Sequence, residues 1–401
     1  MRSTESPALW SRLGTIAAAA LLMGATACGS TTSSGGSTAE QPPTANTKPP
    51  TSIGTPENQL NLIAWEGYTD DSWVKPFTAA TGCVVNHKYA GSSDEMVSLM
   101  KNGGGGQYDM VSASGDADLR LIYSGDVKPM NTALIPDFNN FQTYFKAPAY
   151  NTINGIHYGI SLQWGPNVLL YSTKKFPVAP TSWSAVYDPA NKGLVTAYDY
   201  AITIADAALY LSKSKPSLGI KDPYELTKPQ FDATIALLMQ QRQLIKKYWG
   251  TAGDEINLFE SGDVVIGAAW PYQTIQLKAD GKVAVADTIP SEGATGWGDT
   301  WMLATNALHP NCAYLWTAYV STAKIQALQA LFFGETPVNT KACAEMEALA
   351  AGSCAQYHAD APGTYFNTIH FWKTPIATCD DGSKNCIDYS QWQAAWTTIT
   401  A

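Results

Sequence analysis

The chain of 401 residues lacks any cluster of basic side chains, and its formal net charge is −9. Nucleic acids are bound through Lys and Arg side chains that neutralise phosphate groups, so the sequence argues against a nucleic-acid partner. Arg is scarce throughout, which argues against an anionic ligand that would need guanidinium groups around it. An acidic protein of this kind favours cationic partners.

The chain also lacks the short motifs of common enzymes and metal sites. It contains neither Gly-x-Ser-x-Gly nor His-Glu-x-x-His, and no Cys-x-x-Cys pair. The glycine run 103–106 is not followed by the Lys-Ser/Thr of a phosphate-binding loop and predicts a surface turn. We therefore expect that the protein is not an enzyme and that it binds neither a metal nor a cofactor. A secreted hydrolase with two carboxylates in a cleft is the remote alternative. The five histidines are scattered: His87, His157, His309, His358 and His370.

The N-terminus carries an apolar run, 16–23, that is too short to span a bilayer. Arg2 and Arg12 precede this run, and small residues then lead to Cys28. A basic start, a short apolar run and a cysteine after small residues are typical of a bacterial lipoprotein signal peptide, here 1–27. We expect cleavage before Cys28 and acylation of its thiol and its new amino group.

Residues 28–58 are rich in Ser, Thr, Gly and Pro and have almost no large apolar side chain. Such a segment cannot bury enough surface to offset its conformational entropy, which predicts a flexible tether. The remaining body is longer than one hydrophobic core usually serves, so two lobes are expected. The 13 Trp and 20 Tyr of the whole chain suit a pocket that grips a ligand by ring faces.

Seven cysteines are present, and Cys28 is assigned to lipid. An even number of remaining cysteines in an exported protein predicts three disulfides. Six cysteines can be joined in many ways, so the residues alone leave the pairing open. They are Cys83, Cys312, Cys343, Cys354, Cys379 and Cys386.

Hydrophobic periodicity in the first part of the body predicts strands at 60–64, 83–89 and 108–111. Helices are expected between them, one after the cap candidates 69–72 and ending at Gly82, and one around 96–100. This β-α-β-α-β alternation predicts a parallel sheet covered by helices. Ligands bind at the carboxyl ends of such strands, where Trp65, Tyr68 and Ser114 fall.

The later part of the body alternates in the same manner. Strands are expected at 168–171, from 192 and at 264–270. A helix is expected to open at 181, and others to cover 205–211, 231–248, 312–320 and 323–333, with a break at 334–339.

The order of these pieces resembles the extracytoplasmic solute-binding proteins of bacterial ABC importers, and within them the spermidine/putrescine-binding branch. The resemblance covers 60 to about 365, and it depends on the order and spacing of the markers rather than on any one of them. The markers are Trp65 with Tyr68, the strand end 108–114, Trp164-Gly165, Trp183, Lys192-Gly193, Gly262-Asp263 with Trp270, 290–293 with 297–299, and Gly334 with Pro337 and Asn339.

The resemblance implies an α/β, two-lobe periplasmic-binding-protein fold (type II-like). Each lobe would be a mostly parallel sheet flanked by helices, with the ligand cleft between the lobes. Lobe 1 would take 59–163 and 299–337, and lobe 2 would take 166–296 and 340–401. This division implies the disulfides Cys83–Cys312 in lobe 1, and Cys343–Cys354 and Cys379–Cys386 in lobe 2.

The resemblance also implies a set of ligand-binding residues. Asp299 would anchor one amine, with Ser114 as a polar contact and Trp164 at the back wall. The aromatic walls would be Trp65, Tyr68, Trp270 and Trp297.

Three acidic positions depart from the family pattern. Asp116 stands where an aromatic is usual, and it could instead cap the helix that begins there. Glu335 replaces a Tyr-like residue. Asp199 could hold the other amine, although its register is open by one residue and Thr203 falls where a Glu is often found. A cationic ligand is compatible with these changes, whereas spermidine or putrescine specifically does not follow from them.

The implied function is capture of a small cationic solute, foremost a polyamine, for delivery to an ABC permease and its ATPase. Cys28 would anchor the protein, as a monomer, to the outer face of the cell membrane. Another amine, a quaternary ammonium compound or a sugar are the alternative ligands for the same fold.

Overall fold

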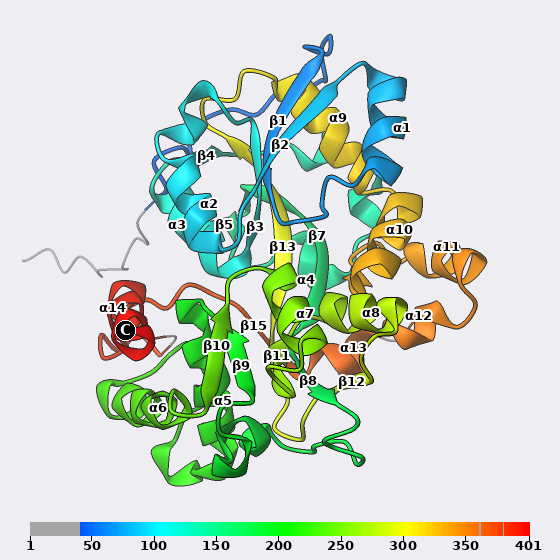
Figure 1. Ribbon diagram of the computed structural model, residues 1–401. Helices are drawn as coiled ribbons and strands as arrows, with labels where there is room; N and C mark the ends of the chain where they lie inside the picture. Colours follow the sequence, from blue (N-terminus) through cyan, green and yellow to red (C-terminus); the bar gives the residue numbers. More distant parts are fainter. Residues whose placement is uncertain (1–40, 361, 380) are drawn as a thin grey trace, which may run out of the picture. The chain divides into compact units, whose positions relative to one another are not determined.

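The computed structural model describes residues 41–360, 362–379 and 381–401. The predicted signal peptide and Cys28 lie outside the described residues. Two β-sheets, each with helices around it, organise the described chain, and we call them the first lobe (larger sheet) and the second lobe (smaller sheet) (Figure 1). This arrangement agrees with the expected α/β fold.

The larger sheet is built around the predicted β-α-β-α-β unit, in which β1 pairs in parallel with β2 and with β3. β13 then pairs antiparallel with both β3 and β7. In spatial order the strands are β14 (Thr336–Pro337), β7 (Gly159–Pro166), β13 (Ala294–Ala304), β3 (Met110–Ser114), β1 (Gln59–Ala64) and β2 (Val84–Tyr89), with β4 (Val127–Lys128) and β15 (Ile369–Phe371) also on β13.

The smaller sheet has five strands and mixes parallel with antiparallel pairs. A separate two-stranded hairpin joins β5 (Thr152–Ile153) to β6 (Ile156–His157). The order in the smaller sheet is β10 (Ile245–Trp249), β9 (Val195–Tyr198), β11 (Ile266–Ala269), β8 (Val168–Ser172) and β12 (Val285–Thr288).

Local sequence explains where the helices begin and end. Asp70 caps α1 by accepting a hydrogen bond from the backbone N–H of Ser72, and Gly82 ends it in the left-handed conformation. The helices are α1 (Asp71–Thr81), α2 (Ser93–Met100), α3 (Gly115–Tyr123), α4 (Thr143–Lys146), α5 (Ile204–Ser214), α6 (Lys228–Gln241), α7 (Ala252–Glu260), α8 (Pro271–Asp280), α9 (Pro310–Val320), α10 (Ala323–Phe333), α11 (Ala342–Leu349), α12 (Ser353–Gln356), α13 (Pro362–Phe366) and α14 (Tyr389–Thr400).

β7 and β13 connect the two lobes, and Figure 1 shows them running side by side through the middle of the described chain. β13 pairs with β3 of the first lobe over 299–303 and with β15 over 294–296. We call the place where β7 and β13 pass from one lobe to the other the crossing. Two large hydrophobic cores lie on either side of the crossing, one around Trp301 and one around Leu170. The crossing places the residues near 297–299 between the two cores.

Three of the predicted elements need correction. The helix expected over 231–248 ends at Gln241, and the chain continues into β10, which pairs in parallel with β9. The β-branched and aromatic side chains of Ile245, Tyr248 and Trp249 suit a strand, and pairing with β9 prevails over helical periodicity. The strand expected at 108–111 runs instead over Met110–Ser114, and the helix expected at 181 is a short 3₁₀ helix, Trp183–Tyr187.

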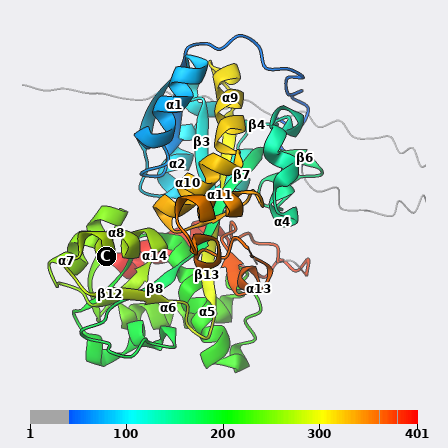
Figure 2. The same ribbon diagram turned by 90° about the vertical axis from the view of Figure 1, so that its right-hand side faces the viewer.

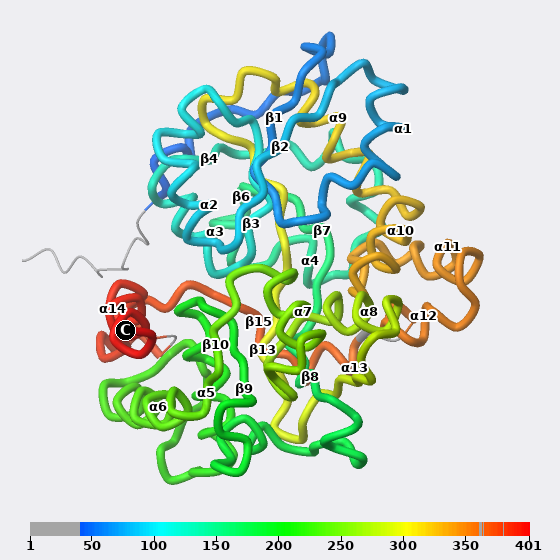
Figure 3. Tube along the Cα trace, viewed as in Figure 1, coloured from blue at the N-terminus to red at the C-terminus, as the bar shows by residue number. Residues whose placement is uncertain are grey.

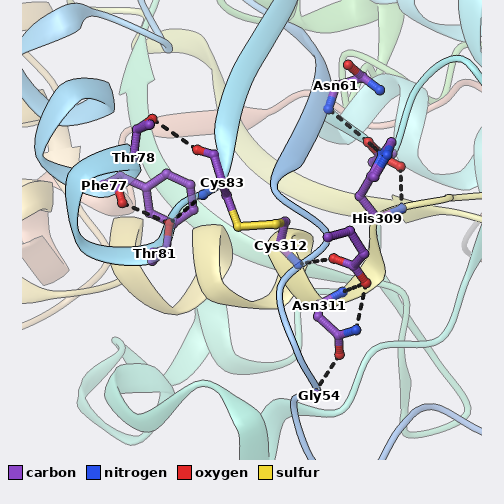
Figure 4. The surroundings of a disulfide bond; sticks show 11 residues. Gly54, Asn61, Phe77, Thr78, Thr81, Cys83, His309, Asn311 and Cys312 are labelled. Atoms are coloured by element: carbon purple, nitrogen blue, oxygen red, sulfur yellow. Dashed lines mark hydrogen bonds and ion pairs between the residues drawn. A yellow bond between two sulfur atoms is a disulfide. The ribbon is translucent and has the colours of Figure 1, made fainter.

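All three disulfides implied by the resemblance are present in the structure. Cys83–Cys312 joins the chain after α1 to α9 (Figure 4). Beside this bond, Glu57 accepts hydrogen bonds from the backbone N–H groups of Asn311 and Cys312, at 3.0 and 2.9 Å. The carboxylate therefore caps the start of α9.

The described part of the predicted tether, from residue 41, contacts the first lobe. Thr44 is buried and donates to the carbonyl of Val127, and the backbone N–H of Gly54 donates to the side chain of Asn311. Asn131 donates to the carbonyl of Pro50. The segment after residue 41 is thus attached to the lobe rather than hanging free of it.

The last part of the chain, after residue 340, packs on both sides of the crossing. α11 packs against α10, through Ala342 and Met346 against Ala327 and Ala330 (Figure 2), whereas the resemblance assigned all of 340–401 to lobe 2. Further along, β15 pairs with β13, and the chain then passes to α14, which lies beside α6 (Figure 3). The aromatic face of α14 completes the core of the second lobe.

Candidate functional site

A cavity of about 500 Å³ lies between the two lobes. This volume is in the range of small-molecule binding sites. Its walls come from the loop after β1, the ends of β2 and β3, the starts of α7 and α8, β13 and the turn between α10 and β14. The residues that line it are Trp65, Glu66, Tyr68, Lys88, Tyr89, Ala90, Gly91, Ser92, Glu95, Ser114, Asp199, Gly250, Thr251, Ala252, Trp270, Tyr272, Trp297, Asp299, Phe333, Glu335 and Trp372.

Aromatic rings from both lobes line the cavity. Trp65 meets Trp270 edge to face, with ring centroids 6.0 Å apart. Trp270 is held in turn by Trp249 at 5.0 Å. Tyr272 lies 5.7 Å from Phe333. Such rings present faces to methylene groups and to cations, and cation–π contact contributes about 0.5–2 kcal/mol.

Asp299 is anchored at the inner end of the cavity by two hydroxyl groups. The Ser114 hydroxyl donates to Oδ1 at 2.5 Å, and the Tyr68 hydroxyl donates to Oδ2. Asp299 is only 2 % exposed, and β13 brings it directly opposite Ser114 of β3. The strand pairing therefore fixes the orientation of this carboxylate before any ligand arrives.

Burial raises the pKa of Asp299 to about 7, and the hydrogen bonds from Ser114 and Tyr68 oppose this shift. Burial, together with the neighbouring Asp299, also raises the pKa of Glu335 well above its ordinary value. The inner end of the cavity thus holds two carboxyl groups whose ionised forms need a positive partner.

The lining of the cavity is strongly acidic. It contains five carboxyl groups, and Lys88 is the one cationic side chain among the described residues that line the cavity. Lys88 lies 3.3 Å from Glu95, so this cation is already paired. The arrangement attracts a cationic guest and repels an anionic one. The carboxyl groups are those of Glu66, Glu95, Asp199, Asp299 and Glu335.

The structure brings eight of the ten candidate ligand-binding residues to this cavity. Asp199 lies at its edge, where the Trp396 indole N–H donates to Oδ1 at 2.9 Å. Glu66 is exposed and also lines the cavity. The eight are Trp65, Tyr68, Ser114, Asp199, Trp270, Trp297, Asp299 and Glu335.

The structure places Asp116 outside the cavity lining, in a contact between the lobes. It is fully buried and accepts hydrogen bonds from Ser93 at 3.1 Å and from Tyr200 of the second lobe. Arg120 lies 3.6 Å away and also donates to Asp94 at 2.6 Å. Through these partners, Asp116 links α2 and α3 to the second lobe.

Trp164 also lies outside the cavity lining. It is fully buried, and it stacks on Phe145 with ring centroids 5.9 Å apart. Tyr365, Phe366 and Phe371 surround the rest of its indole. Because its position on β7 directs it into this aromatic cluster, Trp164 supports the crossing from behind.

Sequence reasoning did not identify several residues of the cavity wall. Tyr89 is the last residue of the second parallel strand, so the rule for strand ends could have found it. Trp372 follows β15, which reaches the site only because it pairs with β13. Tyr272 and Phe333 belong to helices with no distinctive pattern. For these last three residues the sequence carries no signal.

Two other features are absent from the described residues. Within 41–401, apart from 361 and 380, no group of three or more His, Cys, Asp or Glu side chains is arranged to hold a metal ion. In the same part of the chain, none of the helices has the length and apolar content needed to cross a bilayer.

Comparison with known families gives a match over residues 72–352, to the family described as "bacterial extracellular solute-binding protein". The match spans more than half of the chain. The chain belongs to this family. The cavity between the lobes is therefore the expected solute site of an extracytoplasmic solute-binding protein.

Individual relatives of this solute-binding protein are distant. A putrescine/cadaverine-binding protein of Pseudomonas aeruginosa is 23 % identical over 275 residues, which is 65 % of this chain and 73 % of the relative. A putative spermidine/putrescine ABC transporter protein of Listeria monocytogenes has a TM-score of 0.71 at 17 % identity, covering 85 % and 98 % of the two chains. A Treponema pallidum lipoprotein has a TM-score of 0.68 at 16 % identity, covering 85 % and 99 %. The two structures support the fold.

Proposed function

We propose that this protein captures a polyamine outside the cytoplasm and delivers it to an ABC permease driven by its ATPase. The observation that carries the proposal is the composition of the cavity lining. It contains five carboxyl groups and many aromatic rings, and its one Lys among the described residues is paired with Glu95. A polyamine needs carboxylates at its ammonium groups and ring faces along its methylenes. The name of the Pseudomonas aeruginosa relative agrees with this ligand class.

The inner end of the cavity would bind one ammonium group through Asp299. The carboxylate is oriented by Ser114 and Tyr68 before the ligand arrives. Such pre-organisation reduces the entropy that binding must otherwise overcome. The aromatic rings of Trp65 and Trp270 would cover the methylene chain. Asp199, at the edge of the cavity, would meet the second ammonium group.

Thermal stabilisation of the purified protein by putrescine, cadaverine, spermidine, a quaternary diammonium and glucose tests this proposal. A ligand at a hundredfold excess over its Kd raises the unfolding free energy by about 2.7 kcal/mol. We expect this shift with at least one primary polyamine. Stabilisation by glucose alone would overturn the cationic assignment and leave a sugar-binding protein of the same fold.

A matched pair of variants shows whether the shift comes from this cavity. Asp299→Asn is expected to weaken the binding of the stabilising amine at least thirtyfold, because loss of a buried charge partner costs about 2 kcal/mol or more. Asp232→Asn alters an exposed carboxylate on α6 and should bind as the unaltered protein does. Equal affinity in both variants would mean that the amine binds elsewhere.

Lipid attachment at Cys28 is the second part of the proposal, supported by the apolar run 16–23 and the small residues before the cysteine. Mass spectrometry of the membrane fraction from expressing cells is expected to show diacylglyceryl on Cys28. Cys28→Ser should release the protein from that fraction. A Cys28→Ser protein that stays membrane-bound would contradict the anchor. Sedimentation of the released protein should show a monomer.

A further inference from the structure

Glu335 has an unsatisfied carboxylate oxygen at the inner end of the cavity. The side chain lines the cavity, is 4 % exposed, and its Oε2 has no hydrogen-bond partner among the described residues. The resemblance leads one to expect a Tyr-like residue at this position. Glu335 is therefore a departure of this chain from the general pattern of the family.

Asp299 and Glu335 share this end of the cavity and repel one another when both are ionised. Burial and the neighbouring Asp299 raise the pKa of Glu335, and burial raises that of Asp299. Asp299 already receives two hydroxyl hydrogen bonds, whereas Glu335 Oε2 receives none from the described residues. The empty pair is therefore most stable with a proton on Glu335.

Other titratable groups around the pair add no free positive charge. Lys88, which lines the cavity, is paired with Glu95, and Arg120 on α3 is engaged by Asp94 and Asp116. The remaining groups that interact with the pair or its neighbours are neutral or acidic: Tyr68 after β1, Asp116 and Asp118 on α3, Tyr150 before β5, and Tyr198 on β9. A positive charge at the pair must come from a ligand.

We propose that Asp299 and Glu335 together form the seat for one primary ammonium group, which displaces a proton from the pair as it binds. This inference rests on the proposed function. The O–H bond of the Glu335 carboxyl group breaks, its proton leaves to solvent, and the ammonium N–H groups donate to both carboxylates. The ammonium keeps its own protons, so the charge of the occupied seat equals that of the protonated empty pair.

The seat selects primary ammonium groups over quaternary ones. A primary ammonium has three N–H donors, enough for both carboxylates at once. A trimethylammonium group has none and would leave buried oxygens without donors. Sites built to donate or accept hydrogen bonds reject analogues that cannot make them far more strongly than apolar pockets reject a change in size.

Calorimetry of putrescine binding to the purified protein tests this seat. Titrations at pH 7 in phosphate and in Tris, whose ionisation enthalpies differ, report the number of protons released. Because Asp299 is also partly protonated at pH 7, we expect at least one proton per putrescine and a Kd that falls at least tenfold per pH unit between pH 5.5 and 7. Glu335→Gln should release less than half as many protons, and Glu345→Gln, at an exposed position on α11, should match the unaltered protein.

The hexamethyl derivative of putrescine, with both nitrogens quaternary, gives a second readout that needs no variant. We expect it to bind at least a hundredfold more weakly than putrescine. Equal affinity for the two diamines, or equal proton release by the unaltered protein and a folded Glu335→Gln variant, would overturn the seat and leave polyamine capture intact. A protein that binds no primary amine at any pH would overturn both.

Discussion

Replacing Asp299 by Asn is expected to stabilise the ligand-free protein above neutral pH, although it removes a hydrogen-bonded carboxylate. The pKa of Asp299 is about 7 in the folded protein, against an ordinary value of 3.8. A group whose pKa is raised by folding stabilises the fold below its unfolded pKa and loses that contribution as pH rises through the folded one. The loss therefore falls between about pH 4 and pH 7.

The size of the effect follows from the same shift. A difference of about three pKa units corresponds to about 4 kcal/mol, which is the upper limit of what Asn recovers at pH 8. Because Asn can accept a hydrogen bond through only one oxygen, either Ser114 or Tyr68 must turn its hydroxyl to accept from the amide. This rearrangement costs about 1 kcal/mol. A net gain of about 2–3 kcal/mol remains.

Urea unfolding of both proteins without ligand, at pH 5 and at pH 8, measures this difference. The variant should be more stable at pH 8, and the advantage should shrink at pH 5 because Asp299 is then protonated in the fold. A variant that is less stable by the same amount at both pH values would refute the argument. It would show that the carboxylate is stabilised by its hydroxyl partners more than burial penalises it.

Two further substitutions test the packing behind the site and the link between α1 and α9. In Gly165→Ala, a methyl group at 165 would lie 2.8 Å from the indole of Trp297. We expect the ring to move into the cavity and calorimetry to show about tenfold weaker amine binding; unchanged affinity would argue against this. Replacing Cys83 and Cys312 together by Ser opens a loop with a sequence separation of 229. We expect about 3–5 kcal/mol less stability in urea and unchanged ligand affinity at 20 °C, and an unchanged unfolding midpoint would contradict this.

The alternation of strands and helices was predictable because it depends on local periodicity. The first parallel unit, from β1 to β3, is confirmed, with the third strand shifted by a few residues. Where the prediction was wrong, at 242–248, a segment with helical spacing pairs with the strand edge of β9, and most of it belongs to β10. Local pattern cannot anticipate such a partner, since β9 lies about fifty residues earlier in the chain.

Residues at strand ends were also predictable, because the end of a parallel strand has a known place in the fold. Trp65, Tyr68 and Ser114 reached the cavity on this ground. Asp116 and Trp164 carry equally suggestive residue types, but one joins the two lobes and the other stacks in an aromatic cluster. Residue type does not say which face of an element a side chain occupies when both faces are buried.

The sequence by itself determined the α/β alternation, the acidic balance, the even number of body cysteines and the resemblance to solute-binding proteins. Tertiary structure alone decided which carboxyl groups meet. Tyr68 and Asp299 are 231 residues apart, and they meet because β13 pairs with β3 beside the loop after β1. Burial of Glu335 raises its pKa, and the neighbouring Asp299 adds to this rise. Both effects depend on how the turn after α10 packs against that crossing, which no local pattern in the chain encodes.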